Sequence, residues 1–177
     1  MSAEANPKFA LRPYLPTDAA LLAEIFRASI EELTGDDYSE AQRGVWAAVA
    51  DDETAFGARL ARELTLVATL SGAPVGFVSL KGADRLDLIY VHPAVAGQGA
   101  GAMLCDAVER IATSRGTPRL TTDASDTARG FFERRGYVAQ QRNSVSFGDE
   151  WLANTTMEKR LAPKSGASGQ GGPKGGA

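Results

Sequence analysis

The segment from residue 86 to residue 115 constrains the fold of this chain more than any other. Its first part, Leu86 to Val91, is an apolar run typical of a buried strand. A loop with glycines at 97, 99 and 101 follows. The apolar residues after the loop recur at helical spacing and predict a helix: Leu104, Val108 and Ile111. The segment therefore predicts a strand, a glycine-rich loop and the N-terminus of a helix.

Such a loop is suited to hold a phosphate. The first backbone N–H groups of a helix have no partner within the helix, and the helix dipole adds positive potential at this end. A glycine lets the backbone approach a bound anion closely and also allows positive φ. We therefore expect the main-chain amides of residues 97–102 to form a cradle for a pyrophosphate.

Two common phosphate-binding loops do not fit these residues. A Walker loop needs Lys and then Ser or Thr after its last glycine, but Ala102 and Met103 follow here. In the dinucleotide-binding fingerprint counted from Gly99, the third glycine would fall at Leu104. The loop belongs to neither class.

The same loop resembles that of the GNAT N-acetyltransferase superfamily, Gln/Arg-x-x-Gly-x-Gly/Ala after a hydrophobic-Val-x-Pro step. The matching residues are Tyr90-Val91-His92-Pro93 and Gly99-Ala100-Gly101, with Ala96 at the Gln/Arg position as the one departure. A second block resembles the family's later segment: Ala128, Phe131, Phe132, Glu133, Gly136 and Tyr137. Because the cradle is made of backbone amides, Ala96 predicts weaker anchoring rather than loss of binding.

The resemblance implies a mixed α/β (α+β) fold, with a mostly antiparallel central sheet flanked by helices. The residues predict strands at 9–14, 64–70, 75–80, 86–91, about 120–123, and within 138–147 and 154–161. Helices are expected after Thr17, Ser39 and Thr54, after the glycine loop, and from Thr127 to Arg135. We expect one domain over residues 9–161, a flexible start at 1–8 and a disordered Gly/Ser-rich tail at 162–177.

The resemblance also implies that acetyl-CoA lies between the central strand and the next strand, and that the acetyl group passes directly to an amine. The expected cofactor-binding residues are Ile89, Tyr90, Val91, Gly97, Gln98, Gly99, Ala100, Gly101, Ala102, Ser125 and Phe132. No metal is expected. Ser125 stands where many family members have asparagine, and Phe132 where many have the tyrosine that protonates the leaving thiolate.

Two catalytic roles have candidate residues. Asp87 lies two residues before Ile89, so strand alternation predicts that both share a face, which makes Asp87 the expected base for the amine. An ion pair without catalytic involvement is the alternative role. With phenylalanine at 132, Tyr90 and Tyr137 are the candidate proton donors, and water is the alternative. The backbone N–H of Val91 is expected to stabilise the oxyanion.

The acceptor pocket is expected between the segment after the first helix and the last strands, with Tyr38, Trp46 and Asn154 as its candidate residues. Aromatic walls with a few polar groups favour a small-molecule amine. More loosely, the chain resembles the bacterial YafP-like branch of acetyltransferases. A non-catalytic acyl-CoA-binding module and a protein or peptide N-acetyltransferase remain alternatives.

Composition limits the other function classes. The formal net charge of −3 gives no general attraction to nucleic acid or to an anionic membrane. The single cysteine, Cys105, allows no intrachain disulfide and is expected to be a small buried hydrophobe. No membrane-spanning run or secretory signal is visible, so a cytoplasmic location is expected. A monomer and a homodimer both remain open.

Overall fold

The computed structural model describes residues 8–163. The predictions for residues 1–7 and 164–177 lie outside this range. In chain order, the strands and α-helices are β1 (Phe9–Pro13), α1 (Ala19–Leu33), α2 (Glu40–Ala47), α3 (Glu53–Arg62), β2 (Leu64–Leu70), β3 (Ala73–Lys81), β4 (Arg85–Val91), α4 (Ala100–Ser114), β5 (Arg119–Ser125), α5 (Arg129–Arg134), β6 (Val138–Phe147) and β7 (Glu150–Arg160).

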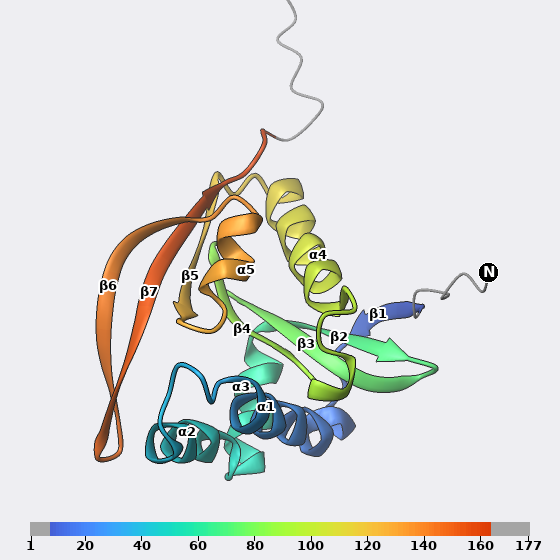
Figure 1. The fold of residues 1–177 in the computed structure, drawn as a ribbon. Helices are drawn as coiled ribbons and strands as arrows, with labels where there is room; N and C mark the ends of the chain where they lie inside the picture. The colour runs from blue at the N-terminus through green and yellow to red at the C-terminus, as the bar shows by residue number, and fades with distance from the viewer. Residues whose placement is uncertain (1–7, 164–177) are drawn as a thin grey trace, which may run out of the picture.

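Within the described residues, seven strands form one sheet in the order β1-β2-β3-β4-β5-β7-β6. Neighbouring strands are antiparallel except β4 and β5, which are parallel. The helices α1 to α3 cover one face of the sheet, and α4 and α5 cover the other (Figure 1). The predicted mixed, mostly antiparallel α/β fold is confirmed.

Local sequence signals explain where two of the helices begin. Ser39 and Gln42 form the predicted capping box at α2, in which each side chain accepts a hydrogen bond from the other residue's backbone N–H. Helix α3 instead begins after Asp52, whose carboxylate accepts from the N–H of Ala55 at 3.0 Å. It therefore starts slightly before the predicted Thr54.

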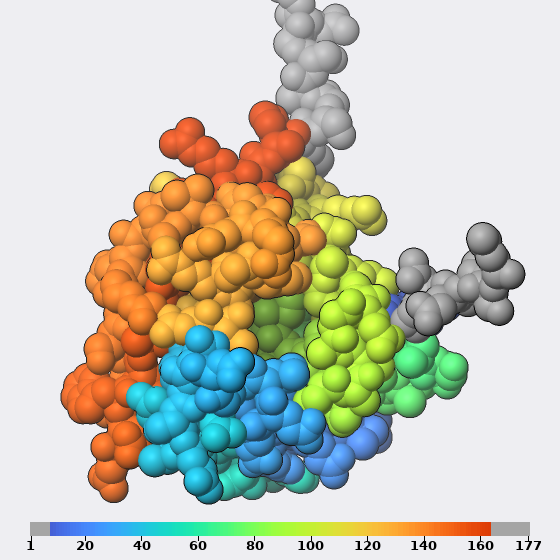
Figure 2. Space-filling model, in the orientation of Figure 1, coloured from blue at the N-terminus to red at the C-terminus, as the bar shows by residue number. Residues whose placement is uncertain are grey.

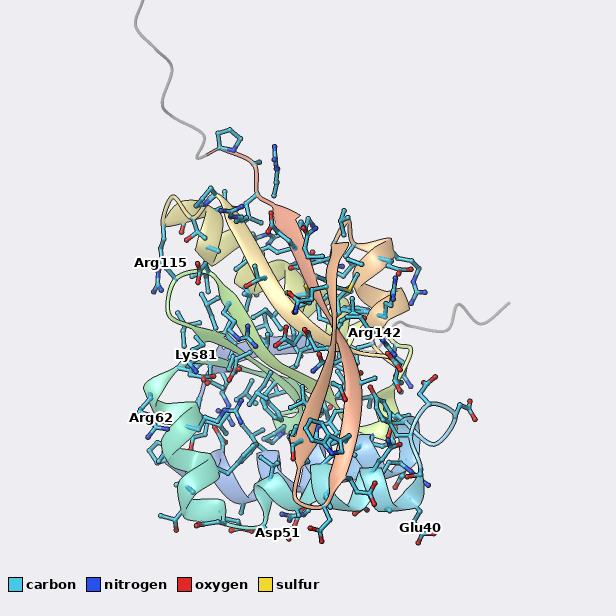
Figure 3. All side chains as sticks on the ribbon, turned by 90° about the vertical axis from the view of Figure 1, so that its left-hand side faces the viewer. Glu40, Asp51, Arg62, Lys81, Arg115 and Arg142 are labelled. Atoms are coloured by element: carbon cyan, nitrogen blue, oxygen red, sulfur yellow. The ribbon has the colours of Figure 1, made fainter. Side chains whose placement is uncertain are left out.

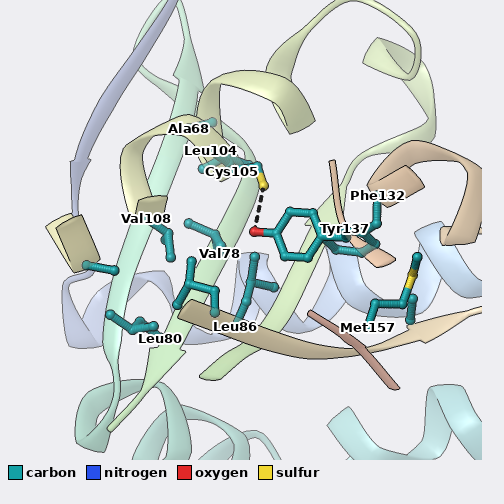
Figure 4. Close-up of a cluster of buried hydrophobic side chains, with 13 residues drawn as sticks. Ala68, Val78, Leu80, Leu86, Leu104, Cys105, Val108, Phe132, Tyr137 and Met157 are labelled. Carbon is teal, nitrogen blue, oxygen red and sulfur yellow. Dashed lines mark hydrogen bonds between the residues drawn. The ribbon is translucent and has the colours of Figure 1, made fainter. Parts of the chain in front are cut away.

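Two apolar clusters hold the helices against the sheet. Figure 4 shows the cluster on the α4 side, where Leu104 and Val108 pack against Val78 of β3, and the Cys105 thiol lies 3.8 Å from the Tyr137 hydroxyl. Burial raises the pKa of Cys105 to about 11, so the thiol stays protonated near neutral pH. Cys105 is the small buried residue that the sequence predicts.

The cluster on the opposite face is rich in aromatic rings. Phe26 of α1, Phe56 of α3 and Phe77 of β3 pack here, and the ring of Tyr90 lies 4.6 Å from that of Phe26. Leu88 of β4 belongs to this cluster as well.

A bulge interrupts β4. Leu86 pairs with Leu80, but the next pair is Leu88 with Ser79, so Asp87 is an extra residue in β4. Leu86 consequently packs in the α4-side cluster, whereas Leu88 packs in the α1-side cluster. Regular alternation would have placed both leucines on one face.

Candidate functional site

The central strands β4 and β5 meet at one end and separate toward the other. Their only recorded pair among the described residues is Arg85 with Thr121. A cavity of about 270 Å³ opens where the strands diverge. Figure 2 shows the hollow between α5, the N-terminal helices and the loop before α4, with the sheet as its floor. The gap leaves part of the β4 edge free to pair with a bound ligand.

The cavity brings together most of the predicted site residues. Its lining includes Tyr38, Trp46, Asp87, Ile89, Tyr90, Ser125, Phe132 and Asn154. Val91 and the loop of residues 97–102 lie outside the lining. The sequence analysis did not single out Arg59, Arg85 or Asp123, which also line the cavity.

The glycine loop has the geometry expected of an anion cradle. Gly97 and Gly99 have φ of 74° and 96°, in the region that favours glycine. Gly99 caps α4, and its carbonyl accepts the N–H of Met103 at 3.1 Å. Across the described residues, the N–H groups of residues 97–102 donate no recorded hydrogen bond within the protein. These amides are therefore free to bind an external anion.

The backbone of β4 aims two further donors at the gap. The N–H of His92 donates to the Val75 carbonyl on β3 at 2.8 Å. Since N–H groups alternate in direction along a strand, those of Val91 and Ile89 point away from β3, toward β5. They lie in the plane of the sheet, where they can bind an extended ligand or an oxyanion.

Asp87 is held on the α3 side of the sheet. Its carboxylate accepts from the Arg59 guanidinium at 2.8 Å, and Arg85 lies 3.9 Å away. Ile89 packs instead against the α4-side cluster, so the prediction that both residues share a face is wrong. The bulge at Asp87 is the cause, because one extra residue shifts the alternation.

The electrostatic surroundings keep Asp87 ionised. Burial acts to raise its pKa, but the neighbouring Glu63 carboxyl, the hydrogen bonds from Arg59 and the charges of Arg59 and Arg85 bring the pKa below its ordinary value. Glu63 shows the opposite shift: burial and then the neighbouring Asp87 carboxylate raise its pKa to about 7. The sequence analysis missed Glu63, because nothing in its local pattern indicates a carboxyl partner on β4.

The two tyrosines that are candidate proton donors, Tyr90 and Tyr137, differ in where their hydroxyls lie. Tyr90 lines the cavity, and burial raises the pKa of its phenol although the neighbouring Trp46 side chain opposes the shift. Tyr90 can thus donate a hydrogen bond but is a weak acid. The Tyr137 hydroxyl lies against Cys105 in the opposite core, and burial raises its pKa too.

Ser125 and Phe132 form the part of the cavity next to α5. The Ser125 hydroxyl oxygen accepts the N–H of Ala128 at 3.1 Å, which fixes the turn into α5. Phe132 is 1% exposed, and its ring packs edge-on against Tyr137 at 5.1 Å. Phe132 therefore offers an apolar wall and no proton.

The acceptor side is closed by contacts between α2 and the last strands. The Tyr38 hydroxyl donates to the Ala153 carbonyl at 2.6 Å and accepts from the Asp126 N–H at 2.9 Å. Its ring lies 5.3 Å from that of Trp46. Only the Tyr38 ring is therefore available to a ligand, since the hydroxyl is already engaged.

Polar groups on β6 and β7 continue this wall. The Asn154 amide oxygen accepts from the Asn143 amide at 2.9 Å. Arg142, labelled in Figure 3, binds the Asp126 carboxylate beside it. Trp151 is 63% exposed and does not line the cavity.

The described residues offer neither a membrane-spanning helix nor a metal-binding cluster. None of the helices there combines the length and the apolar character that crossing a membrane requires. The same residues contain no group of three or more His, Cys, Asp or Glu side chains placed to hold a metal.

Known sequences resemble this chain over most of its length. The sequence model of the acetyltransferase (GNAT) domain matches residues 34–161. The uncharacterised N-acetyltransferase YafP of Escherichia coli K12 is 30% identical over 147 residues, which are 83% of this chain and 93% of YafP. The peptidyl-lysine N-acetyltransferase YjaB of Salmonella typhimurium is 31% identical over 127 residues, 70% of this chain and 69% of YjaB. The predicted resemblance to YafP is confirmed.

Solved structures give the same result. A crystal structure named GCN5-related N-acetyltransferase, aminotransferase class II, from Rhodopseudomonas palustris is 59% identical with a TM-score of 0.86, covering 91% of this chain and 99% of that chain. The PaiA N-acetyltransferase of Thermoplasma acidophilum, solved with coenzyme A, shares the fold at 18% identity and a TM-score of 0.72, covering 87% of this chain and 99% of its own. The chain belongs to the GNAT family of N-acetyltransferases.

Proposed function

We propose that this acyltransferase moves an acetyl group from acetyl-CoA directly to a primary amine of a small molecule. The observation that carries the proposal is the cavity between β4 and β5, which joins a closed aromatic acceptor side to the free edge of β4. The glycine loop lies just beyond the end of that strand. An extended cofactor that pairs with β4 and ends at the loop would fit this arrangement.

The free amides of residues 97–102 support acetyl-CoA as the cofactor. They have no partner within the protein and would form an anion site close to Val91, and the structure of PaiA was solved with coenzyme A. Gly97 and Gly99 would hold the diphosphate, while Ile89 and Val91 would pair with the pantetheine arm. When bound, acetyl-CoA supplies an activated acetyl group as a thioester.

The chain's own groups would assist three events of the transfer. Asp87 would accept a proton from the substrate ammonium and leave a neutral amine. The Val91 N–H would stabilise the oxyanion that forms when the amine attacks. As the carbon–sulfur bond breaks, its electron pair stays on sulfur, and the second proton lost by nitrogen neutralises the thiolate. Phe132 cannot donate that proton, so water or the Tyr90 phenol would carry it.

A second candidate acceptor is a lysine of a protein or peptide, because the relative YjaB is named a peptidyl-lysine N-acetyltransferase. The closed acceptor side favours a small molecule. Tyr38 ties the segment before α2 to β7, and Gln42 donates to the Trp151 carbonyl at 2.8 Å. These contacts leave less room for a peptide backbone. The cytoplasmic location stays a prediction, and both the monomer and the homodimer stay open.

A thiol-release assay tests the proposal. The protein is incubated with acetyl-CoA and either a panel of small primary amines or lysine-containing peptides, and free thiol is followed against a no-acceptor control. We expect release with at least one small amine and no peptide-dependent release. Release with peptides alone would favour the second candidate. Tight binding of acetyl-CoA without any release would instead support a non-catalytic module.

A further inference from the structure

A buried carboxyl group without a complete set of partners lies behind Asp87. Glu63 follows α3 directly, and its side chain is only 8% exposed. Its Oε2 atom is buried and has no hydrogen-bond partner among the described residues. The neighbouring Ser79 is fully buried, and its hydroxyl also lacks a close partner. A buried polar atom without a partner is costly, so this arrangement needs an explanation.

The charges around Glu63 do not balance if every carboxyl group is ionised. The polar groups that face this region come from α3, β3, β4 and β5: Arg59, Ser79, Arg85, Asp87 and Asp123. Arg59 lies 3.9 Å from Glu63 and 2.8 Å from Asp87, while Arg85 lies 2.6 Å from Asp123. Two guanidinium groups thus face three carboxyl groups. One added proton would neutralise the excess negative charge.

We infer that Glu63 holds this proton and shares it with Asp87, so that the two carboxyl groups act as one proton acceptor for the substrate amine. Asp87 lines the cavity, whereas Glu63 does not. Glu63 is therefore a positioning residue that acts through Asp87. The catalytic role of the pair rests on the proposed function, whereas the shared proton does not depend on it.

The pair explains how a carboxylate held by two arginines can serve as a base. Alone beside Arg59 and Arg85, Asp87 would be too weak a base to take a proton from an ammonium group efficiently. When both carboxyl groups are ionised, their repulsion favours the uptake of one proton. The proton from the substrate would enter at Asp87, be held by Glu63, and leave to water after the transfer.

The direction of both pKa shifts agrees with this geometry. The pKa of Glu63 is raised, mainly by burial and then by Asp87, while Glu63 and Arg59 help to lower that of Asp87. Such a pair titrates in two widely separated steps, and the upper step lies near neutral pH.

The test compares Glu63→Gln with a matched control, Glu53→Gln. Glu53 is an exposed carboxylate at the other end of α3. Glutamine keeps the size of Glu63 and can donate to Asp87, but it cannot gain or lose a proton. Two readouts are used: ¹³C NMR titration of the carboxyl carbons, and the pH dependence of kcat at saturating acetyl-CoA and amine.

We expect one carboxyl carbon to titrate near neutral pH in the wild type and in E53Q, and this titration to be lost in E63Q. In E63Q the acid limb of kcat should move at least about one pH unit lower, and the plateau should fall about tenfold or more because the base is weaker. Wild-type carboxyl carbons that all titrate in the ordinary range would overturn the inference. So would an unchanged pH profile in folded E63Q.

Two further outcomes stay decisive. If E63Q does not fold, Asp87→Asn replaces it in the NMR experiment. The Glu63 carboxyl should then titrate at lower pH than in the wild type. A Glu63 titration at the wild-type pH would contradict the shared proton. If no amine is acetylated at any pH, the proposed function fails and the role in catalysis fails with it. The NMR titration still decides whether the two carboxyl groups share a proton.

Discussion

Alanine at Gly99 and alanine at Gly101 should have different effects on the stability of the protein and on its affinity for CoA. Gly99 has φ of 96° and ψ of 0°, whereas Gly101 lies in the first turn of α4. A Cβ at Gly99 would meet no protein atom within 4 Å, and a Cβ at Gly101 would lie 3.6 Å from the Phe131 ring, an ordinary contact. Neither Gly99→Ala nor Gly101→Ala therefore causes a clash, and the two differ only in backbone conformation and in what the Cβ faces.

The expected magnitudes follow from that difference. Alanine at the left-handed position of Gly99 costs about 1–2 kcal/mol. Alanine in the helix at Gly101 gains up to about 1 kcal/mol, because glycine is a poor helix former. For a domain of this size, 1 kcal/mol shifts Tm by about 2–4 °C. We therefore expect Tm to fall by about 2–8 °C in G99A and to rise by up to about 4 °C in G101A.

Binding should follow the same order, with G99A as the damaging change and G101A as the tolerated one. In G99A, relief of the backbone strain should turn the amides of the loop, and the new Cβ would lie on the open side where the diphosphate would bind. We therefore expect the Kd for CoA to rise at least about tenfold, which corresponds to about 1.4 kcal/mol of binding free energy. G101A should bind CoA nearly as the wild type does. Calorimetry with CoA and thermal melts of the same samples measure both effects. Equal CoA affinity in G99A and the wild type would refute the cradle.

Four further predictions concern the charged site, the tail and the thiol. Because the folded pKa of Glu63 is raised from 4.5 to about 7, the folded state binds more protons in that range, and stability should fall by up to about 3 kcal/mol as pH rises across it. E63Q should lose this slope in urea melts at a series of pH values. Asp87→Asn should lower kcat by about a hundredfold or more by slowing amine deprotonation, and a rate within about twofold of the wild type would remove Asp87 from the mechanism. Truncation after Leu161 should leave kcat and KM unchanged, and a clear loss of either would give the tail a function. Cys105 should react with a thiol reagent only after denaturation, and rapid labelling of the native protein would contradict its burial.

The strand, glycine loop and helix were predictable because their signals are local. Apolar spacing and glycines indicate this unit without any knowledge of the rest of the chain. The role of Tyr38 was predicted only in part, because local signals do not reveal partners that are distant in the sequence. Its ring lines the cavity as predicted, but its hydroxyl binds backbone groups more than 80 residues away in sequence. No local pattern indicates partners at that separation.

The face of Asp87 was not predictable, because the bulge leaves no mark in the apolar pattern. Leu86 and Leu88 are both apolar, as regular alternation requires, yet they pack on opposite faces of the sheet. Only the pairing with β3 shows the extra residue. Glu63 escaped prediction for a related reason, since its partner Asp87 lies on a different element and is turned toward it by the same bulge.

The bulge has a consequence for how the two halves of the site work together. The amides of Ile89 and Val91 point along the sheet into the gap beside β5, and the side chain of Asp87 stands on the α3 side of the same strand. Without the bulge, Asp87 would share the α4-side face with Ile89, where the apolar cluster contains Leu104 and Val108. A carboxylate there would be buried without Arg59. With Asp87 as the proposed base, an acceptor amine would approach from the side of α1 to α3, where Tyr38 and Trp46 line the cavity, and its proton would meet Asp87 before its nitrogen reached the plane of the sheet.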